Sequence, residues 1–222
     1  MKFPNAYVGV KKIYVSALIS IIASIMVIFA AILALIAPTN EGVLGFVGLL
    51  SLIGGLALIV AFIIQIVGLN NAAKDEIQIK WALYAVAAAI IISILSSLFA
   101  NFKNEAMIEI SNYLKVLVNA VNVVSTYYVL KGIASLSDKL GDKEMNLQGE
   151  SLATLVIILY VVSVVLGLFS TIFGATSIAW LAVLLSIISI IAAIINLVVG
   201  ILTFIYYKKA VLMLEKPASN PE

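Results

Sequence analysis

Polar and charged side chains recur along one predicted helix at the spacing of a single helical face. Consecutive members are separated by 4, 3, 3, 4, 3 and 4 residues, which places all of them on one side of an α-helix. The members of this polar stripe are Glu105, Glu109, Asn112, Lys115, Asn119, Asn122 and Thr126. Ionisable residues inside a membrane face a bundle interior or a water-filled cavity, so such a stripe can line a path for an ion or a polar solute.

The polar stripe also has a second interpretation. Asparagines can hydrogen-bond between helices and hold a bundle together, with a stabilisation of about 0.6–2 kcal/mol per bond. The glutamates and Lys115 then lie in the outer headgroup region, where charge costs little. Under the first interpretation the candidate intramembrane polar site comprises Glu109, Asn112, Lys115, Asn119, Asn122 and, from a later helix, Asn196. Both interpretations stay open from the sequence.

Other groups that carry out chemistry are scarce in the chain. It has no cysteine and no histidine, so thiolate nucleophiles, the usual general base and the commonest metal ligands are missing. All thirteen cations are lysines, and no arginine offers a bidentate clamp for phosphate. Asp138, Asp142 and Glu144 lack the ligand spacing of a calcium loop, and Lys139 and Lys143 offset their charge. We therefore expect no catalytic residue, no cofactor and no metal site, and we expect that the protein is not an enzyme.

The composition identifies the solvent of the fold. Of 222 residues, 64% are hydrophobic and 11% are charged, whereas an ordinary soluble domain is about 45–50% apolar and about 25% charged. A water-soluble fold of this length cannot bury so much apolar surface, so most side chains must contact a lipid bilayer. The net charge of +2 is too small and too scattered for a nucleic-acid surface. Soluble enzymes, nucleic-acid binders and disordered chains are thereby excluded.

Apolar runs long enough to cross a membrane recur six times, since a spanning helix needs roughly 20 such residues. They predict an all-α polytopic membrane bundle of six transmembrane helices, at about 13–37, 43–69, 81–100, 108–130, 152–173 and 178–207. The run over 108–130 contains Lys115, which costs about 2.5–3.5 kcal/mol at mid-membrane and far less near a helix end.

Two of the predicted helices continue into the cytoplasm. In the fourth, Leu136 and Leu140 keep helical spacing until Gly141 can cap the helix. The sixth continues to Lys216, where Pro217 follows. The sequence thus predicts a single transmembrane domain over 1–216 and a flexible C-terminal tail over 217–222.

Lysine is distributed unequally between the two predicted sides of the membrane. Lys103 and Lys115 belong to one side and eleven lysines to the other. The eleven are Lys2, Lys11, Lys12, Lys74, Lys80, Lys131, Lys139, Lys143, Lys208, Lys209 and Lys216. Because lysine-rich segments stay in the cytoplasm, both termini are expected there. The missing arginine, with abundant Ile, Asn and Lys, is typical of an AT-rich prokaryotic genome, so the expected location is the plasma (inner) membrane of a prokaryote.

The six predicted helices form three hairpins, which suggests three parallel repeats of a two-helix unit. Laying 118–139 over 195–216 pairs Asn119 with Asn196, among other identities. Units with an even number of spans keep one orientation, so such repeats surround an axis along the membrane normal.

A short motif ends the fourth predicted helix. Leu136-Ser137-Asp138-Lys139 is similar to a motif that follows a helix in small six-span prokaryotic membrane proteins of unknown function. The resemblance covers these few residues, and it implies no particular activity.

Small residues also recur at helical spacing, which lets two backbones approach closely in lipid. They are Ser16, Ser20 and Ser24; Gly45, Gly48, Ser51 and Gly55; Ser163, Gly167 and Ser170; and Ser186, Ser189, Ala193, Asn196 and Gly200. Two explanations for these stripes are open. The small residues pack against other helices of the same bundle, or they contact a second copy of the chain or a membrane-protein partner.

Two functions agree with these observations. The first is a non-catalytic multi-pass membrane protein that acts through helix–helix contacts, as a scaffold, assembly factor or complex subunit. The alternative is a small-solute transporter or substrate-binding membrane subunit, which uses the polar stripe to hold a small-molecule ligand. Against the alternative, the paired Gly or Pro breaks typical of transporter sites are limited to Gly54-Gly55.

Overall fold

The computed structural model describes residues 2–36, 39–102, 104–174 and 198–215, without the side chains of residues 31, 35, 105, 163 and 166–174. All regular secondary structure within these ranges is α-helical, which confirms the all-α class. The chain divides into two compact units. One unit contains Met1–Asp75 with Tyr207–Glu222, and the other contains Glu76–Tyr206.

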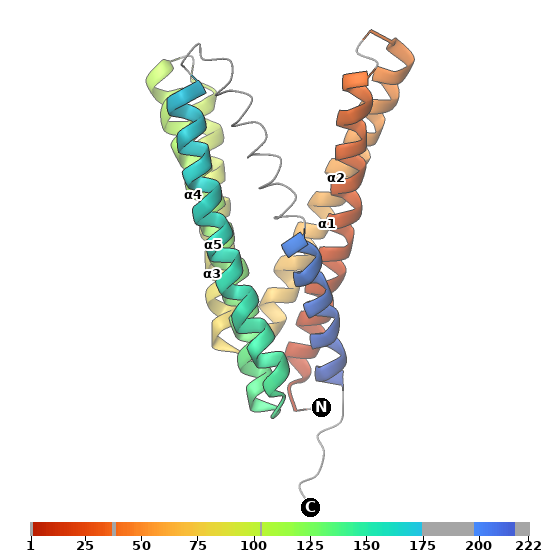
Figure 1. Cartoon of the computed structure of the whole chain (residues 1–222), viewed down its shortest axis with the longest axis vertical. Coiled ribbons are helices and arrows are strands. Elements are labelled where there is room, and N and C mark those ends of the chain that lie inside the picture. Colours follow the sequence, from red (N-terminus) through yellow and green to blue (C-terminus); the bar gives the residue numbers. More distant parts are fainter. Residues whose placement is uncertain (1, 37–38, 103, 175–197, 216–222) are drawn as a thin grey trace, which may run out of the picture. The chain divides into compact units, whose positions relative to one another are not determined.

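Five long helices follow one another along the chain (Figure 1). They are α1 (Pro4–Ile36), α2 (Glu41–Ala72), α3 (Ile77–Ala100), α4 (Glu105–Lys139) and α5 (Lys143–Gly174). Residues 198–215 are helical as well. α1 begins at Pro4 rather than near residue 13, because helical hydrogen bonding continues beyond the apolar run and proline is favoured in the first turn.

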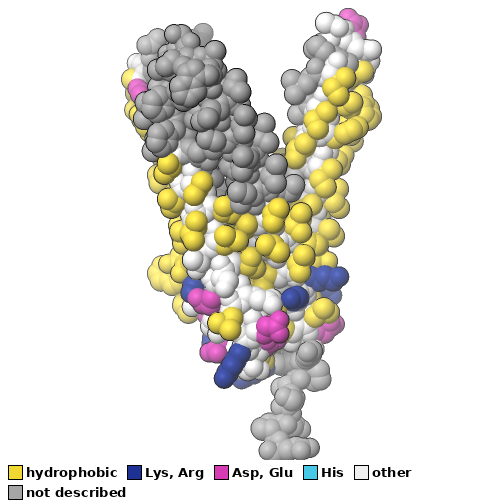
Figure 2. All heavy atoms as spheres, viewed as in Figure 1, with side chains coloured by type: hydrophobic (Ala, Val, Ile, Leu, Met, Phe, Trp, Pro, Cys, Tyr) yellow, Lys and Arg dark blue, Asp and Glu magenta, His cyan; other side chains and the backbone are white. Residues whose placement is uncertain are grey.

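All five helices are long and apolar enough to cross a membrane. Hydrophobic side chains cover the sides of the described helices, and charged side chains gather near helix ends (Figure 2). Residues 175–197 lie outside the described residues and include most of the predicted sixth span; Lys103, Lys216 and the tail lie outside them as well. The count of six spans therefore stays a prediction.

Small residues form the contact between α1 and α2, which run antiparallel in one hairpin (Figure 1). A Cβ atom added to Gly9 would come within 2.5 Å of the Gly68 carbonyl oxygen, so the two backbones touch here. Seven residues further along α1, the Ser16 hydroxyl donates a hydrogen bond of 2.8 Å to the Ala61 carbonyl oxygen. The bond gives the hydroxyl a hydrogen-bond partner, which the hydrocarbon of a bilayer cannot provide.

The same line of contact continues toward the other end of this hairpin. A Cβ atom added to Gly54 would lie 3.4 Å from the Ala23 carbonyl oxygen. Ala23 follows Ser16 by seven residues, and Gly54 precedes Ala61 by seven. A seven-residue period keeps one seam of each helix against its partner, and small residues in that seam let the helices approach closely.

One carboxylate caps the beginning of α1. Asp75 accepts a hydrogen bond from the Ala6 backbone N–H at 2.8 Å and another from the Asn5 side-chain amide at 3.0 Å. Negative charge at a helix N-terminus is favourable because the unpaired N–H groups there carry partial positive charge. Within the same unit, the Tyr7 hydroxyl donates to a carboxylate oxygen of Glu215 at 3.2 Å.

α3 and α4 form a second antiparallel hairpin, and serines again bridge its helices. The Ser96 hydroxyl donates to the Ser111 carbonyl oxygen at 3.0 Å, and the Ser125 hydroxyl donates to the Ala82 carbonyl oxygen at 3.1 Å. Ala82, Ala89 and Ser96 follow one another at seven-residue intervals and are all buried. This hairpin thus has the same kind of seam as α1 and α2, while the repeat relation between hairpins stays a prediction.

α4 is one continuous helix to Lys139, and a glycine ends it. Gly141 has a φ of +80°, a conformation that residues with a Cβ atom rarely adopt. Its N–H donates to the Asp138 carbonyl at 2.9 Å, and the Asp142 N–H donates to the Ser137 carbonyl at 2.9 Å. These two bonds form a Schellman motif, which satisfies the last carbonyls of the helix and turns the chain into α5.

Candidate functional site

The polar stripe lies on one side of α4. Its exposed members are Glu109, Asn112, Lys115, Asn119 and Asn122. Thr126 is half-buried, and both the side chain of Glu105 and the whole of Asn196 lie outside the described residues. The neighbouring side of α4 packs against α3 and buries Ser111 and Ser125. The structure therefore assigns the α3 contact to small hydroxyl side chains and leaves the larger polar ones accessible.

Hydrogen bonds along the polar stripe are local to α4. The Lys115 ammonium donates to the Asn112 amide oxygen at 3.5 Å, and the Tyr113 hydroxyl donates to the Glu109 carboxylate at 3.5 Å. Thr126 donates to a backbone carbonyl one turn earlier, at 3.1 Å. No ion pair of the described residues joins Glu109 to Lys115, because six residues separate them and place them at different angles around the helix.

The stripe offers both hydrogen-bonding and charged groups. Its exposed amides can each donate and accept hydrogen bonds, and its end carries a carboxylate and an ammonium group. Water, a neighbouring helix or a polar solute can use these groups. These exposed groups suit the binding of a polar partner or packing against a neighbouring helix.

A buried carboxylate lies at the other end of the α3–α4 hairpin. The Glu76 side chain is 2% exposed and is the N-cap of α3, where it accepts the Gln78 backbone N–H at 3.4 Å. It also accepts hydrogen bonds from the Ser135 hydroxyl at 3.0 Å and the Lys139 ammonium at 2.6 Å. Since Ser135 and Lys139 belong to the last turns of α4, Glu76 links the start of α3 to the end of α4.

This link explains part of the motif at the end of α4 in structural terms. Lys139 binds Glu76, Leu136 is fully buried, and the Ser137 hydroxyl donates to the Ile133 carbonyl oxygen at 2.9 Å. Sequence reasoning missed Glu76, because an acid between two helices normally faces water. The available signal was its position just before an apolar run, where a side chain can cap the helix.

A second ion pair connects α4 to α5. Lys131 binds the Glu150 carboxylate, and its ammonium lies 5.8 Å from the centre of the Tyr127 ring. The backbones are also close here, because a Cβ atom added to Gly149 would come within 2.9 Å of the Ala134 Cβ atom. These contacts position the beginning of α5 against the end of α4.

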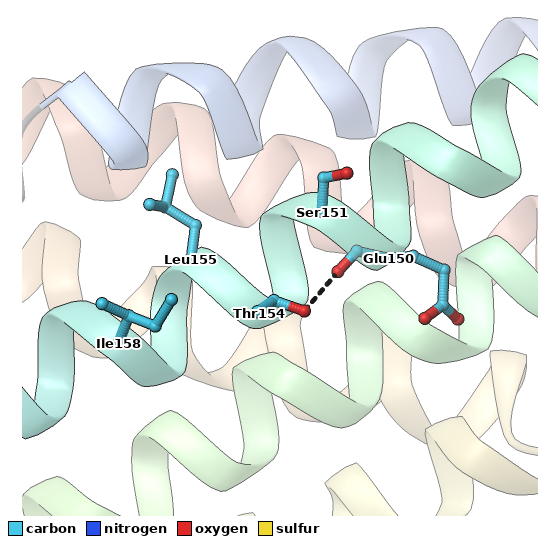
Figure 3. Close-up of a pocket in the computed structure, with 5 residues that line it drawn as sticks. All are labelled: Glu150, Ser151, Thr154, Leu155 and Ile158. Carbon is cyan, nitrogen blue, oxygen red and sulfur yellow. Dashed lines mark hydrogen bonds between the residues drawn. The ribbon is translucent and has the colours of Figure 1, made fainter.

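Glu150 borders a pocket along α5 (Figure 3). The other lining residues are Ser151, Thr154, Leu155 and Ile158, all from the same helix. The Thr154 hydroxyl donates to the Glu150 backbone carbonyl at 3.0 Å, so its proton is already used within the helix. The Glu150 carboxylate, which borders the pocket, forms an ion pair with Lys131. The described lining thus combines the apolar side chains of Leu155 and Ile158 with the exposed hydroxyl of Ser151.

Metal ligands do not come together in the part of the chain that the structure describes. No group of three or more His, Cys, Asp or Glu side chains is close enough there to hold a metal ion.

The architecture defines the class of the protein: in its described residues it is all-helical, with five helices that are long and apolar enough to span a membrane. Comparison with known proteins finds no matching family, no matching curated protein and no matching solved structure.

Proposed function

We propose that the protein is a non-catalytic multi-pass membrane protein that acts through helix–helix contacts, as a scaffold, assembly factor or subunit of a membrane complex. The observation that carries this proposal is a second small-residue face on α2, separate from the face that packs against α1. Reactive groups are also scarce, since the chain lacks histidine and cysteine.

The two faces of α2 differ in what surrounds them. Cβ atoms added to Gly54 and Gly68 would meet atoms of α1 within 3 Å. Cβ atoms added to Gly45, Gly48 and Gly55 would meet no atom within 4 Å. Ser51, between these glycines, is exposed as well. In lipid no hydrophobic effect drives helices together, so a row of small residues favours association by allowing close van der Waals contact. The open face of α2 thus suits a helix of another membrane protein.

Substitution on the open face tests this proposal. Gly48→Leu in the full chain is expected to leave the fold intact, because the added side chain meets empty space, and to dissociate the complex extracted from the native host. Native mass spectrometry after gentle extraction measures what remains bound. Ala87→Leu, an exposed small-to-large change on α3, is the matched control. A Gly48→Leu protein that retains the same partners as the unchanged chain contradicts the proposal.

The alternative function is a small-solute transporter or substrate-binding membrane subunit. One observation favours it: the exposed polar stripe of α4 extends through a helix long and apolar enough to span a membrane. A stripe that held a solute would change ligand binding when its amides are removed, whereas a scaffold would tolerate their removal.

We further propose that the protein lies in the plasma (inner) membrane of a prokaryote with both termini in the cytoplasm. The lysine distribution supports this orientation, because eleven of the thirteen lysines flank one predicted side.

A further inference from the structure

The first two turns of α3 carry an exposed cluster of one lysine and two aromatic residues. Trp81 is 53% exposed and Tyr84 is 50% exposed. Their rings meet edge to face with centroids 5.8 Å apart. The Lys80 ammonium lies 5.8 Å from the centre of the Tyr84 ring. The three side chains thus form one exposed group, which we call the Lys80 cluster.

An apolar face of α3 continues from this cluster along the helix. Its members follow Trp81 and Tyr84 at helical spacing: Ile91, Leu95 and Leu98, with exposed fractions of 60%, 42% and 55%. The opposite side of α3 is buried at Ala82, Ala89 and Ser96, where it contacts α4. One side of α3 therefore packs against α4. The other side carries the Lys80 cluster, followed along the helix by exposed apolar side chains.

The charge of the Lys80 cluster is positive. Glu76, the carboxylate nearest to Lys80 in sequence, forms an ion pair with Lys139. Glu150 in the same unit forms an ion pair with Lys131. Lys80 makes no ion pair with any described residue. Its ammonium is therefore left available to an anion that arrives from outside.

We propose that the Lys80 cluster binds the headgroup of an anionic phospholipid, whose acyl chains lie along the apolar face that continues to Leu98. The Lys80 ammonium, the Trp81 indole N–H and the Tyr84 hydroxyl supply three hydrogen-bond donors for phosphate oxygens. Tryptophan and tyrosine prefer the headgroup level of a bilayer, and lysine extends its charge toward the same level. The order of side chains along α3 therefore matches the order of groups along a phospholipid, from phosphate to hydrocarbon.

Lipid retention by the full-length protein tests this assignment. The purified protein in detergent is mixed with equal amounts of phosphatidylglycerol and phosphatidylcholine, and bound lipid is counted by native mass spectrometry. We expect preferential retention of phosphatidylglycerol. In Lys80→Gln that retention is expected to fall about fivefold, the factor that corresponds to about 1 kcal/mol for one lysine beside anionic lipid.

Lys143→Gln is the matched control, because Lys143 is also exposed, has no ion pair with a described residue and changes the net charge equally. It is expected to retain phosphatidylglycerol like the unchanged protein. Trp81→Leu, which keeps an apolar side chain and removes the indole N–H, provides a second variant and is expected to weaken retention as well.

Four results overturn the assignment. The first is equal retention of the two lipids by the unchanged protein. The second is unchanged retention in both Lys80→Gln and Trp81→Leu while circular dichroism shows intact helices. The third is an equal loss in Lys143→Gln, which indicates net charge rather than a site. The fourth is a dimer that excludes lipid, since a second copy then covers this face.

Discussion

At the scale of single residues, the described hairpins depend on residues with little or no side chain. Gly9 and Gly68 bring the backbones of α1 and α2 into contact, and the Ser16 hydroxyl donates a hydrogen bond to a backbone carbonyl of α2. Large apolar residues instead occupy the exposed sides, as at Ile25, which is 60% exposed. In lipid an exposed isoleucine costs nothing, so packing is decided by how closely backbones approach.

A larger side chain at Gly9 is therefore expected to disrupt the α1–α2 hairpin. Its Cβ atom alone would lie 2.5 Å from the Ala72 backbone nitrogen, so the helices must separate. Gly9→Val is expected to cost about 1–3 kcal/mol or more, the range of overpacked cores, and to lower the unfolding temperature in detergent. Gly45→Val, where nothing lies within 4 Å of the added Cβ atom, is the control and is expected to leave that temperature unchanged. Similar unfolding temperatures for the two variants would show that the hairpin does not need this close contact.

The polar stripe gives a second prediction at the residue scale. Asn119 is exposed on α4, so Asn119→Leu is expected to preserve folding and the retained membrane complex. Thermal unfolding with and without candidate solutes measures the effect, together with native mass spectrometry of the extracted complex. If a solute stabilises the unchanged protein and Asn119→Leu abolishes that stabilisation, the transporter is favoured over the scaffold.

At the scale of elements, the ends of the α3–α4 hairpin are held by different chemistry. Ser96 and Ser111 bridge the helices near one end, while Glu76, Ser135 and Lys139 bridge them at the other. The carboxylate there is 2% exposed, so its charge is stabilised only by the groups that donate to it. This makes the end of α4 sensitive to the loss of one lysine.

Removal of Lys139 is expected to destabilise this hairpin more than neutralisation of Glu76. Lys139→Gln leaves a buried carboxylate without its cation, at a cost of about 1–3 kcal/mol, whereas Glu76→Gln keeps an acceptor for Ser135 and buries no charge. Thermal unfolding of the two single variants and the double variant measures this difference. Strictly additive effects would show that Glu76 and Lys139 do not stabilise each other.

At the scale of the whole molecule, composition and lysine placement govern how the chain relates to the membrane. Five described helices are long and apolar enough to span it, and each of the two compact units contains a hairpin of such helices. The proposed orientation follows from lysines alone and does not depend on how those units pack.

The absence of cysteine makes that orientation directly testable. Asn5→Cys is expected to resist a membrane-impermeant maleimide on intact cells and to react after the cells are opened, because the proposed orientation has the N-terminus in the cytoplasm. Asn40→Cys, in the exposed turn between α1 and α2, is expected to react on intact cells. The reverse pattern would place the termini outside and overturn the proposed orientation.

The all-α class and the apolar length of the described helices could be predicted from the sequence. Each helix satisfies its own backbone in lipid, so a run of apolar residues is sufficient to predict a span wherever its neighbours lie. The polar stripe was predictable for the same reason, since helical period alone places Asn112, Asn119 and Asn122 on one side of α4.

Pairing of faces required the folded chain. Gly54 and Gly55 are adjacent and chemically identical, yet a Cβ atom at Gly54 would meet α1 and one at Gly55 would meet open space. Asp75 and Glu76 are likewise adjacent acids, but one caps α1 and the other is buried against Lys139. Neighbouring residues on a helix or in a turn point in different directions, so their environments depend on where the partner helix lies. That position results from contacts between residues far apart in the chain, which local spacing does not specify.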